Sequence, residues 1–389
     1  MSLRNVSVDY LRTFITLVVV AFHAVIAYMV GAHFNPTFYW SMPIVDTDRW
    51  YGFDIFVDLN DAYFMSLFFF LSGLFVFPSL NRHGLASYLR ERSLRLGLPW
   101  AVTVVFLIPL AYYPSYRLTG ADPDYLSYWQ HTLAFAGWDT VWPSGHTWFI
   151  AMLLIFSIAV AAVLALVPPT VGALGRVGAV AERRPFAFVC ALVTLSWMGH
   201  GLMVHVFGPY RWFGLGPCAF QASRLPLYTI YFLAAVGVGI HGLGRGLLAR
   251  DGPLARRWAT WLLAGLASFA LLEGMKWLFP EVQGTTAAIL PMAAWSLTFT
   301  LTCATFSFAL LAIFLRFVTG QTAILDNLRG NAFGIYLVHY VFIVWLQFAL
   351  LGQPLPAVAK AGLVFLCTIV LSWATTDALR RIPAVGRIL

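Results

Sequence analysis

The chain has 389 residues, of which 60% are apolar and only 10% are charged, and its formal net charge is +8 at pH 7. A soluble domain carries about 25% charged residues, so this chain cannot cover a globule with a water-facing surface. The composition excludes a soluble enzyme and predicts an all-α polytopic membrane protein. The basic residues form no stripe interleaved with aromatic side chains, so we expect no nucleic-acid partner.

Ten apolar stretches are long enough to cross a bilayer, which takes about 20 residues per helix. They cover residues 8–31, 61–79, 96–113, 147–167, 186–207, 224–242, 257–279, 289–316, 332–350 and 357–377. The long eighth stretch is expected to be tilted or broken. Longer loops are expected only at 32–60 and 114–146. We expect one transmembrane domain over residues 1–389, with no appended soluble domain.

The charges indicate how these spans are oriented. If the N-terminus lies in the cytoplasm, most Lys and Arg residues fall on the cytoplasmic side and most Asp and Glu residues fall outside. The positive-inside rule therefore places both termini in the cytoplasm. The four cysteines show no metal-ligand spacing, and three of them lie in apolar runs, so we expect neither a disulfide framework nor a metal site.

The first span contains Asp9, Arg12 and His23, which favours a retained helix over a signal peptide. On a helix, Arg12 and His23 project about 20° apart and lie about 16 Å apart along the axis. Asp9 and Arg12 are either an interfacial pair at the headgroups or part of a polar face that continues to His23. His23 lies past the middle of the span, where an ionisable group usually faces an internal cavity. It is either a structural histidine or a base that takes a proton from a hydroxyl.

The second span and the loop after it carry further candidates. Ser72 and Gly73 are read as a small-residue packing patch rather than a nucleophile, because no Gly-x-Ser-x-Gly elbow is present. We also assign Ser72 to the expected binding site of the acyl donor. The segment LRERSLRLGLPW places Arg90, Arg92 and Arg95 at the start of the third span. These arginines are either positive-inside residues or a clamp for phosphate groups that approach from the cytoplasm.

Four other polar or aromatic residues border or enter later spans. His146 and Trp148 open the fourth span, either as interfacial anchors or as the lining of an outward-facing acceptor pocket. His339 lies about 12 Å from the cytoplasmic end of the ninth span and is a core or a functional histidine. Arg224 is either interfacial or lines the outer half of a cavity.

Together these motifs resemble those of acyltransferase family 3, a family of integral membrane proteins. The resemblance rests on Arg-x10-His (Arg12, His23), FFFLSGLF at 68–75, RERSLRLGLP, HTWF at the fourth span and IYLVH at 335–339. It extends from about residue 5 to 385. The C-terminal segment TDALRRIPAVGRIL and the aromatic first loop look closest to the glucan biosynthesis protein C-like branch, whose members are glucan succinyltransferases.

The resemblance implies transfer of a small acyl group from cytoplasmic acyl-CoA to an extracytoplasmic carbohydrate or lipid-linked glycan. It also implies that His23 is the catalytic histidine, that Arg12 is its motif partner, and that Arg92 and Arg95 are essential basic residues. We therefore expect a multi-pass protein of the bacterial inner membrane, embedded in the lipid bilayer. Its partners would be acyl-CoA as co-substrate and a periplasmic or cell-surface carbohydrate, without a tightly bound cofactor or a metal.

Several alternatives stay open at this point. The acyl group can be acetyl or succinyl, and His23 can act as a general base or form an acyl-histidine intermediate. The oligomeric state is open, including a homodimer. The rival functions are a transporter or flippase, whose intramembrane His and Arg move protons or anions, and a non-catalytic partner in glycan export.

Overall fold

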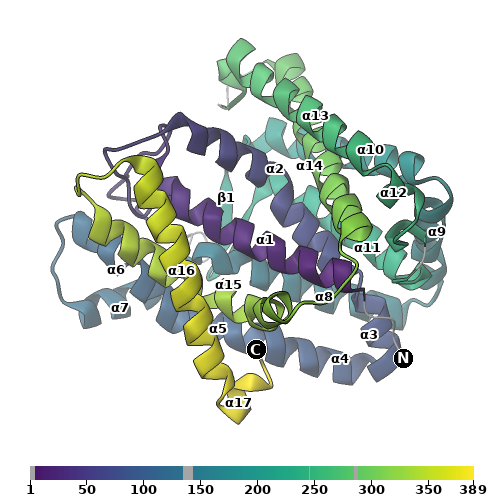
Figure 1. Ribbon diagram of the computed structural model, residues 1–389, viewed down its shortest axis with the longest axis horizontal. Helices are drawn as coiled ribbons and strands as arrows, with labels where there is room; N and C mark the ends of the chain where they lie inside the picture. The colour runs from purple at the N-terminus through teal and green to yellow at the C-terminus, as the bar shows by residue number, and fades with distance from the viewer. Residues whose placement is uncertain (1–4, 135–142, 245, 284–287) are drawn as a thin grey trace.

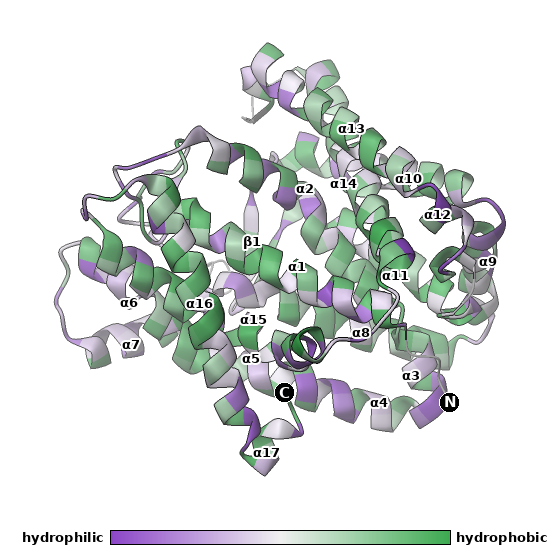
Figure 2. Ribbon diagram, viewed as in Figure 1, coloured by the Kyte–Doolittle hydropathy of each residue, from purple (hydrophilic) through white to green (hydrophobic). Residues whose placement is uncertain are grey.

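A computed structural model describes residues 5–134, 143–244, 246–283 and 288–389 (Figure 1). Within these residues, ten helices are long and apolar enough to cross a membrane. Each overlaps one of the ten predicted spans, so the prediction of an all-α polytopic membrane protein is confirmed. In Figure 2 the long helices are mostly apolar, whereas α4 and the connecting loops are more hydrophilic.

The spans consist, in chain order, of α1 (Val6–Val25) with η1 (Ile26–Tyr28); α2 (Tyr51–Gly73) with α3 (Val76–His83); α4 (Leu85–Arg92), η2 (Ser93–Gly97), α5 (Leu98–Val102), η3 (Thr103–Leu107) and α6 (Ile108–Leu118); η4 (Gly145–Thr147) with α8 (Trp148–Leu166); α10 (Pro185–Phe207); η5 (Ala222–Arg224) with α11 (Leu225–His241); α13 (Trp258–Leu278); α14 (Ile289–Phe317); α15 (Ala323–Leu350); and α16 (Ala357–Arg380). The shorter elements between and after them are α7 (Tyr125–Leu133), α9 (Pro169–Arg183), β1 (Trp212–Leu215), β2 (Cys218–Gln221), η6 (Gly246–Leu248), α12 (Pro253–Arg256), η7 (Pro280–Gln283) and α17 (Pro383–Gly386).

The structure corrects or completes three details of the sequence prediction. The second span begins at Tyr51, so the last ten residues of the predicted 32–60 loop are helical. A carboxylate is tolerated at position 54 of this helix because the backbone amides of Val30 and Gly31 donate hydrogen bonds to Asp54. The eighth span, α14, is one continuous helix of 29 residues and is not broken. A short antiparallel hairpin of β1 and β2, which the sequence did not predict, precedes the sixth span.

The third span is helical but irregular. Its segments η2 and η3 are turns of π-helix, and Pro99 and Pro109 follow them closely. A proline nitrogen cannot donate the hydrogen bond that an α-helix requires, so the ladder closes over five residues instead, as from the Leu98 amide to the Ser93 carbonyl. Turns of this kind are frequent at functional sites, and here one directly follows Arg92.

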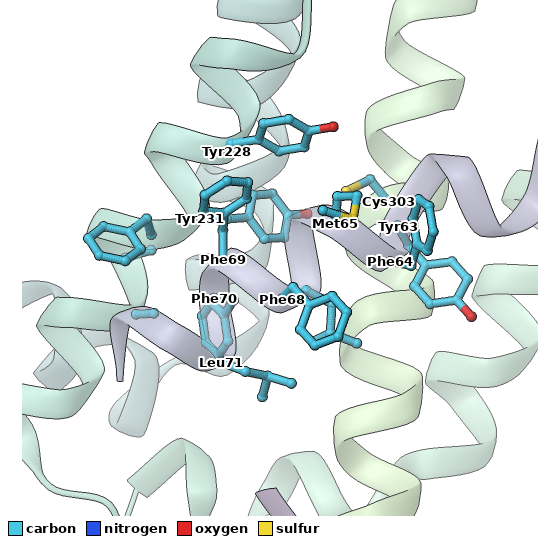
Figure 3. Packing of buried hydrophobic residues seen from close by; sticks show 14 of the residues in the cluster. Tyr63, Phe64, Met65, Phe68, Phe69, Phe70, Leu71, Tyr228, Tyr231 and Cys303 are labelled. Carbon is cyan, nitrogen blue, oxygen red and sulfur yellow. The ribbon is translucent and has the colours of Figure 1, made fainter. Parts of the chain in front are cut away.

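The aromatic run of α2 forms much of the buried core (Figure 3). The ring of Phe69 stacks on Tyr228 of α11 with centroids 4.8 Å apart, and it meets Phe149 of α8 at 4.9 Å. A Cβ atom at Gly73 would lie 2.5 Å from the Phe232 carbonyl oxygen of α11. Only glycine permits this crossing of α2 and α11, which supports a packing role for the small-residue patch in α2.

Helix α1 lies in the middle of the bundle and packs against α2, α14, α15 and α16 (Figure 1). Its surroundings therefore come from segments at both ends of the chain. This position places the polar face predicted for the first span among protein neighbours rather than against lipid alone.

Candidate active site

Three of the predicted histidines lie together. His23 of α1 and His339 of α15 have ring centroids 5.5 Å apart, and His146 of η4 lies 4.6 Å from His339. The ring of Tyr340 adjoins two members, at 5.0 Å from His23 and 5.3 Å from His146. We refer to His23, His146 and His339 as the histidine cluster. Residues predicted separately in spans 1, 4 and 9 thus form one site.

The tautomer of His339 follows from its hydrogen bond. Its Nδ1 lies 2.7 Å from the backbone carbonyl oxygen of Tyr336, which can only accept, so Nδ1 carries the proton and Nε2 carries a lone pair. That Nε2 atom and both ring nitrogens of His146 are buried and have no hydrogen-bond partner among the described residues. A buried polar atom without a partner costs about 1–3 kcal/mol, so the cluster is a place where polar groups of water or substrate are expected.

His23 differs from the other two members because its side chain is only half-buried. No hydrogen bond to its ring is found among the described residues, whereas its backbone is held firmly. The side-chain amide of Gln347 donates to the carbonyl oxygens of His23 (3.0 Å) and Ala24 (3.2 Å). These carbonyls lie at the end of α1, where helical partners run out, so Gln347 fixes the helix end that carries the accessible imidazole.

The histidine cluster does not have the geometry of a metal centre. Within the described residues, no group of three or more His, Cys, Asp or Glu side chains is arranged to hold a metal ion. The three rings meet edge to face or tilted, with interplanar angles of 33° and 62° to His339. Chemically, the cluster places imidazole nitrogens that can donate or accept hydrogen bonds around the accessible ring of His23.

A second group lies toward the N-terminal end of α1. The Arg12 guanidinium is exposed and lies 5.9 Å from the ring centroid of Phe75, and its charge is attracted by Asp9 and, less strongly, repelled by Arg92. Arg92 in turn lies over the ring of Tyr88 at 5.2 Å. In the described part of the chain neither guanidinium forms an ion pair. Two guanidinium groups that lie over aromatic rings and whose charges influence each other suit the oxygens of a phosphate group.

Among the described residues, the other two arginines of the predicted clamp show no contact with Arg12. Arg90 is exposed, and Arg95 is exposed with Nε 3.5 Å from the Glu91 carboxylate. Asp9 forms an ion pair with Arg329 of α15 at 3.4 Å. Of the three arginines of the predicted clamp, Arg92 is thus the one found to interact with Arg12 in the described part of the chain.

Ser72 is half-buried near the end of α2, and its carbonyl accepts a hydrogen bond from the amide of Phe75. Phe75 is also the ring beneath Arg12. No contact of the Ser72 hydroxyl distinguishes a donor-binding role from a packing role. Its assignment to the donor site therefore stays a prediction.

The remaining two candidates lie near each other at the other end of the bundle. Trp148 stacks on Tyr228 with centroids 5.7 Å apart. Arg224 is buried, with Nη2 2.6 Å from an Asp61 carboxylate oxygen and its guanidinium 3.8 Å above the ring of Phe299. Arg224 is thus neither interfacial nor an unpaired cation.

Sequence reasoning missed Asp61, because it lies at the edge of what was read as the second span. A signal was present, since Asp54, Asp58 and Asp61 follow the i, i+4, i+7 spacing of one helix face. The predicted loop over 32–60 concealed that pattern.

One face of α1 connects the arginines to the histidine cluster. Because α1 is continuous from Val6 to Val25, Arg12 and His23 keep the separation of about 16 Å along the axis that a helix dictates. The predicted alignment of these two residues therefore holds in the structure.

Comparison with known proteins adds one match. A family model described as an acyltransferase domain covers residues 5–377. No curated protein and no solved structure matches the chain, so the glucan-modifying branch stays a prediction. The matched region contains the histidine cluster and both Arg12 and Arg92. The chain belongs to acyltransferase family 3 and is a membrane acyltransferase.

Proposed function

We propose that the protein moves an acyl group from cytoplasmic acyl-CoA to a hydroxyl group of a carbohydrate on the other side of the membrane, with His23 as general base. The observation that carries this proposal is the accessible imidazole of His23 on the same helix as the exposed Arg12. A base at membrane depth and an anion site at one membrane face are what a phosphate-bearing donor requires.

The donor would bind from the side of the N-terminus. Acyl-CoA carries several phosphate charges and cannot enter the apolar interior, so these charges would stay with Arg12 and Arg92. The pantetheine arm is comparable in length to the separation of about 16 Å between Arg12 and His23. Binding along α1 would thus bring the thioester carbonyl to the histidine cluster.

The acceptor would reach the same place from the opposite side. One ring nitrogen of His23 takes the proton of the acceptor hydroxyl as its oxygen attacks the thioester carbonyl carbon. The tetrahedral intermediate then collapses, the carbon–sulfur bond breaks, and the leaving thiolate takes the proton from the His23 imidazolium. His146, His339 and Trp148 are proposed to bind the acceptor near this point, and no tightly bound cofactor or metal is required by these steps.

The proposal extends to location and substrates. We place the protein in a bacterial inner membrane with both termini in the cytoplasm, and we propose acetyl or succinyl as the acyl group. A glucan is the proposed acceptor, on the resemblance of the C-terminal segment and first loop to the glucan-modifying branch. Arg224 would act at the acceptor side through Asp61 and Phe299, which it contacts.

The test is release of CoA thiol from radiolabelled acetyl-CoA and succinyl-CoA by the purified protein in liposomes. We expect release by the wild type, and a fall of at least about 100-fold in His23→Ala, since general-base catalysis contributes about 10²- to 10⁴-fold. The matched control is His205→Ala, which changes an exposed histidine on α10 and should leave release unchanged. If neither donor is turned over with a crude periplasmic glycan fraction present, the transporter or export-partner function becomes the better proposal.

A further inference from the structure

A pocket of about 540 Å³ opens at the end of α1 away from the N-terminus. Its lining includes Asp54 and Asp58 of α2, Glu273, Lys276 and Trp277 of α13, and Tyr210 of the loop before β1. Neither the sequence motifs nor the family match assigns a role to this pocket. It lies on the side from which the acceptor would arrive.

The charges of the pocket are arranged in a network with an excess of carboxylates. The Lys276 ammonium lies 2.6 Å from an Asp58 oxygen and 2.9 Å from a Glu273 oxygen. Asp54 adds a third carboxylate, which is held by backbone amides rather than by a cation. The excess negative charge disfavours an anionic ligand, whereas carboxylate oxygens with spare lone pairs accept hydrogen bonds from hydroxyl groups.

Aromatic side chains complete the lining. Trp277 is 69% exposed and Tyr210 is 48% exposed, so both present accessible ring surface beside the carboxylates. Partial burial in the pocket raises the pKa of Tyr210, so its hydroxyl stays protonated and can donate or accept. A sugar ring carries hydroxyl groups at its rim and C–H groups on its flat surface. Carboxylates can accept hydrogen bonds from the hydroxyls, and aromatic rings can pack on the C–H groups.

A line of carboxylates leads inward from the pocket along α2. Asp54, Asp58 and Asp61 share one helix face, and Asp61 lies about 10 Å deeper than Asp54 by the helical rise. Asp61 is 39% exposed even though it bonds the buried Arg224, so a polar ligand can reach it. The three carboxylates thus lead from the pocket into the interior of the helix bundle.

The same line ends at about the depth of His23. Helices α1 and α2 pack together and run in opposite directions. At their outer end the Gly31 amide donates a hydrogen bond of 2.8 Å to the Asp54 carboxylate, which fixes the register of the two helices. Farther in, the rings of Phe22 and Phe64 lie 4.9 Å apart. His23 is the neighbour of Phe22, and Asp61 lies one turn before Phe64, so Asp61 and the accessible imidazole lie at about the same depth.

We infer that this pocket binds the acceptor, and that the acceptor is an uncharged polyhydroxylated chain such as a neutral oligosaccharide. Hydroxyl groups would donate to Asp58 and Glu273, Lys276 would donate to a ring or hydroxyl oxygen, and Trp277 would cover a sugar face. The carboxylates of α2 then guide one hydroxyl toward His23. This inference rests on the proposed function, because it assigns the acceptor site of that same reaction.

The first experiment measures binding without any turnover. Tyr210→Cys is made in a protein whose accessible cysteines, Cys190, Cys218 and Cys367, are replaced by Ala, and its rate of maleimide labelling is followed in liposomes. The probes are neutral hexasaccharides of glucose, galactose and mannose, and a uronic acid hexasaccharide of equal length. The control position is Tyr125→Cys on α7, which is exposed and does not line the pocket.

We expect at least one neutral hexasaccharide to slow labelling of Tyr210→Cys at least fivefold without an effect at Tyr125→Cys, and the uronic acid probe to have none. Equal protection by the uronic acid probe, or no protection by any neutral probe, would overturn the inference.

The second experiment separates binding from a structural clamp between α2 and α13. Asp58→Asn should raise the acceptor KM at least tenfold with little change in the KM for acyl-CoA. The double variant Asp58→Lys with Lys276→Asp keeps an ion pair but exchanges the positions of its charges. It should not restore the acceptor KM, and restoration would show a structural clamp and overturn the inference. Loss of thiol release in the wild type itself, with protection intact, would instead count against the proposed function alone.

Discussion

The backbone carbonyl oxygen of Tyr336 accepts a hydrogen bond of 2.7 Å from Nδ1 of His339, and this bond fixes the tautomer of the histidine. Nε2 is left as a bare acceptor inside the histidine cluster, where it has no partner among the described residues. The ring of His23 lies 5.5 Å away, centroid to centroid. A small approach of the two rings would let one His23 nitrogen donate to this acceptor and leave the other nitrogen as the base.

His339 is therefore predicted to position His23 for proton transfer. His339→Phe removes the acceptor, and we expect kcat to fall about 10- to 100-fold, the range seen when an orienting partner is lost, with little change in the KM for acyl-CoA. His339→Gln keeps an acceptor oxygen and should recover part of the loss. The measurement is steady-state thiol release across pH, in which the acidic limb, set by the protonation of the base His23, should shift in His339→Phe. Equal defects in the two variants, or a defect in the KM alone, would contradict this role.

The sequence was sufficient to predict the ten membrane spans and to single out the polar residues within them. Ten runs of apolar residues predicted ten helices, because a membrane span is encoded locally by composition and length. The alignment of Arg12 with His23 followed from helix geometry alone. These predictions needed no knowledge of how one helix packs on another.

The meeting of the histidines could not be predicted in this way. His23 and His339 are 316 positions apart in the sequence, and periodicity places a residue on a face without saying which helix covers it. The partner of Arg224 was missed for the same reason, since Asp61 comes from α2. The start of α2 was missed because its carboxylates lower the hydropathy of the segment, which was therefore assigned to a loop. Carboxylates with amide or cationic partners are nevertheless tolerated in a membrane helix.

Arg12 and Arg92 are predicted to bind the phosphates of the donor, unlike Arg90 and Arg95. Arg12→Gln and Arg92→Gln should each raise the KM for acetyl-CoA roughly 10- to 100-fold, because a hydrogen bond to a charged group is worth about 1.5–3 kcal/mol. The KM for acetyl-pantetheine, which lacks these phosphates, should not change.

The matched controls are Arg90→Gln and Arg95→Gln. Both residues are exposed, and Arg95 already pairs with Glu91, so each change should alter the KM less than about twofold. The assignment would be wrong if Arg95→Gln matched Arg12→Gln, or if acetyl-pantetheine were affected as strongly as acetyl-CoA.

The proposed orientation predicts which loops face the outside of the cell. Asp122 lies in the exposed segment between α6 and α7, and the exposed Arg183 ends helix α9 between the fourth and fifth spans. Asp122→Cys should react with a membrane-impermeant maleimide in intact cells, whereas Arg183→Cys should react only after permeabilisation. Both are made in the background without Cys190, Cys218 and Cys367. The opposite pattern would invert the assigned sides and with them the donor and acceptor faces.

A buried ion pair connects the first loop to the last span. Lys360, in the first turn of α16, is fully buried with Nζ 2.9 Å from Asp46 and 2.8 Å from Asp48. Asp46 is itself only 1% exposed. The pair joins positions 314 residues apart and holds the segment that leads from α1 into α2, and therefore the wall of the pocket that contains Met42.

Breaking this buried ion pair should lower the free energy of unfolding more than breaking an exposed ion pair. Lys360→Met leaves the Asp46 carboxylate buried without its cation, a change that typically destabilises by about 3–5 kcal/mol. Arg381→Met is the matched control, because Arg381 is 81% exposed in its pair with Asp377 and such pairs contribute less than about 1 kcal/mol. Thermal unfolding of the purified proteins in detergent should show a large fall in Tm for the first variant and almost none for the second. Adding Asp46→Asn to Lys360→Met should restore part of the Tm, since it removes the orphaned charge, and a double variant less stable than Lys360→Met would contradict this explanation.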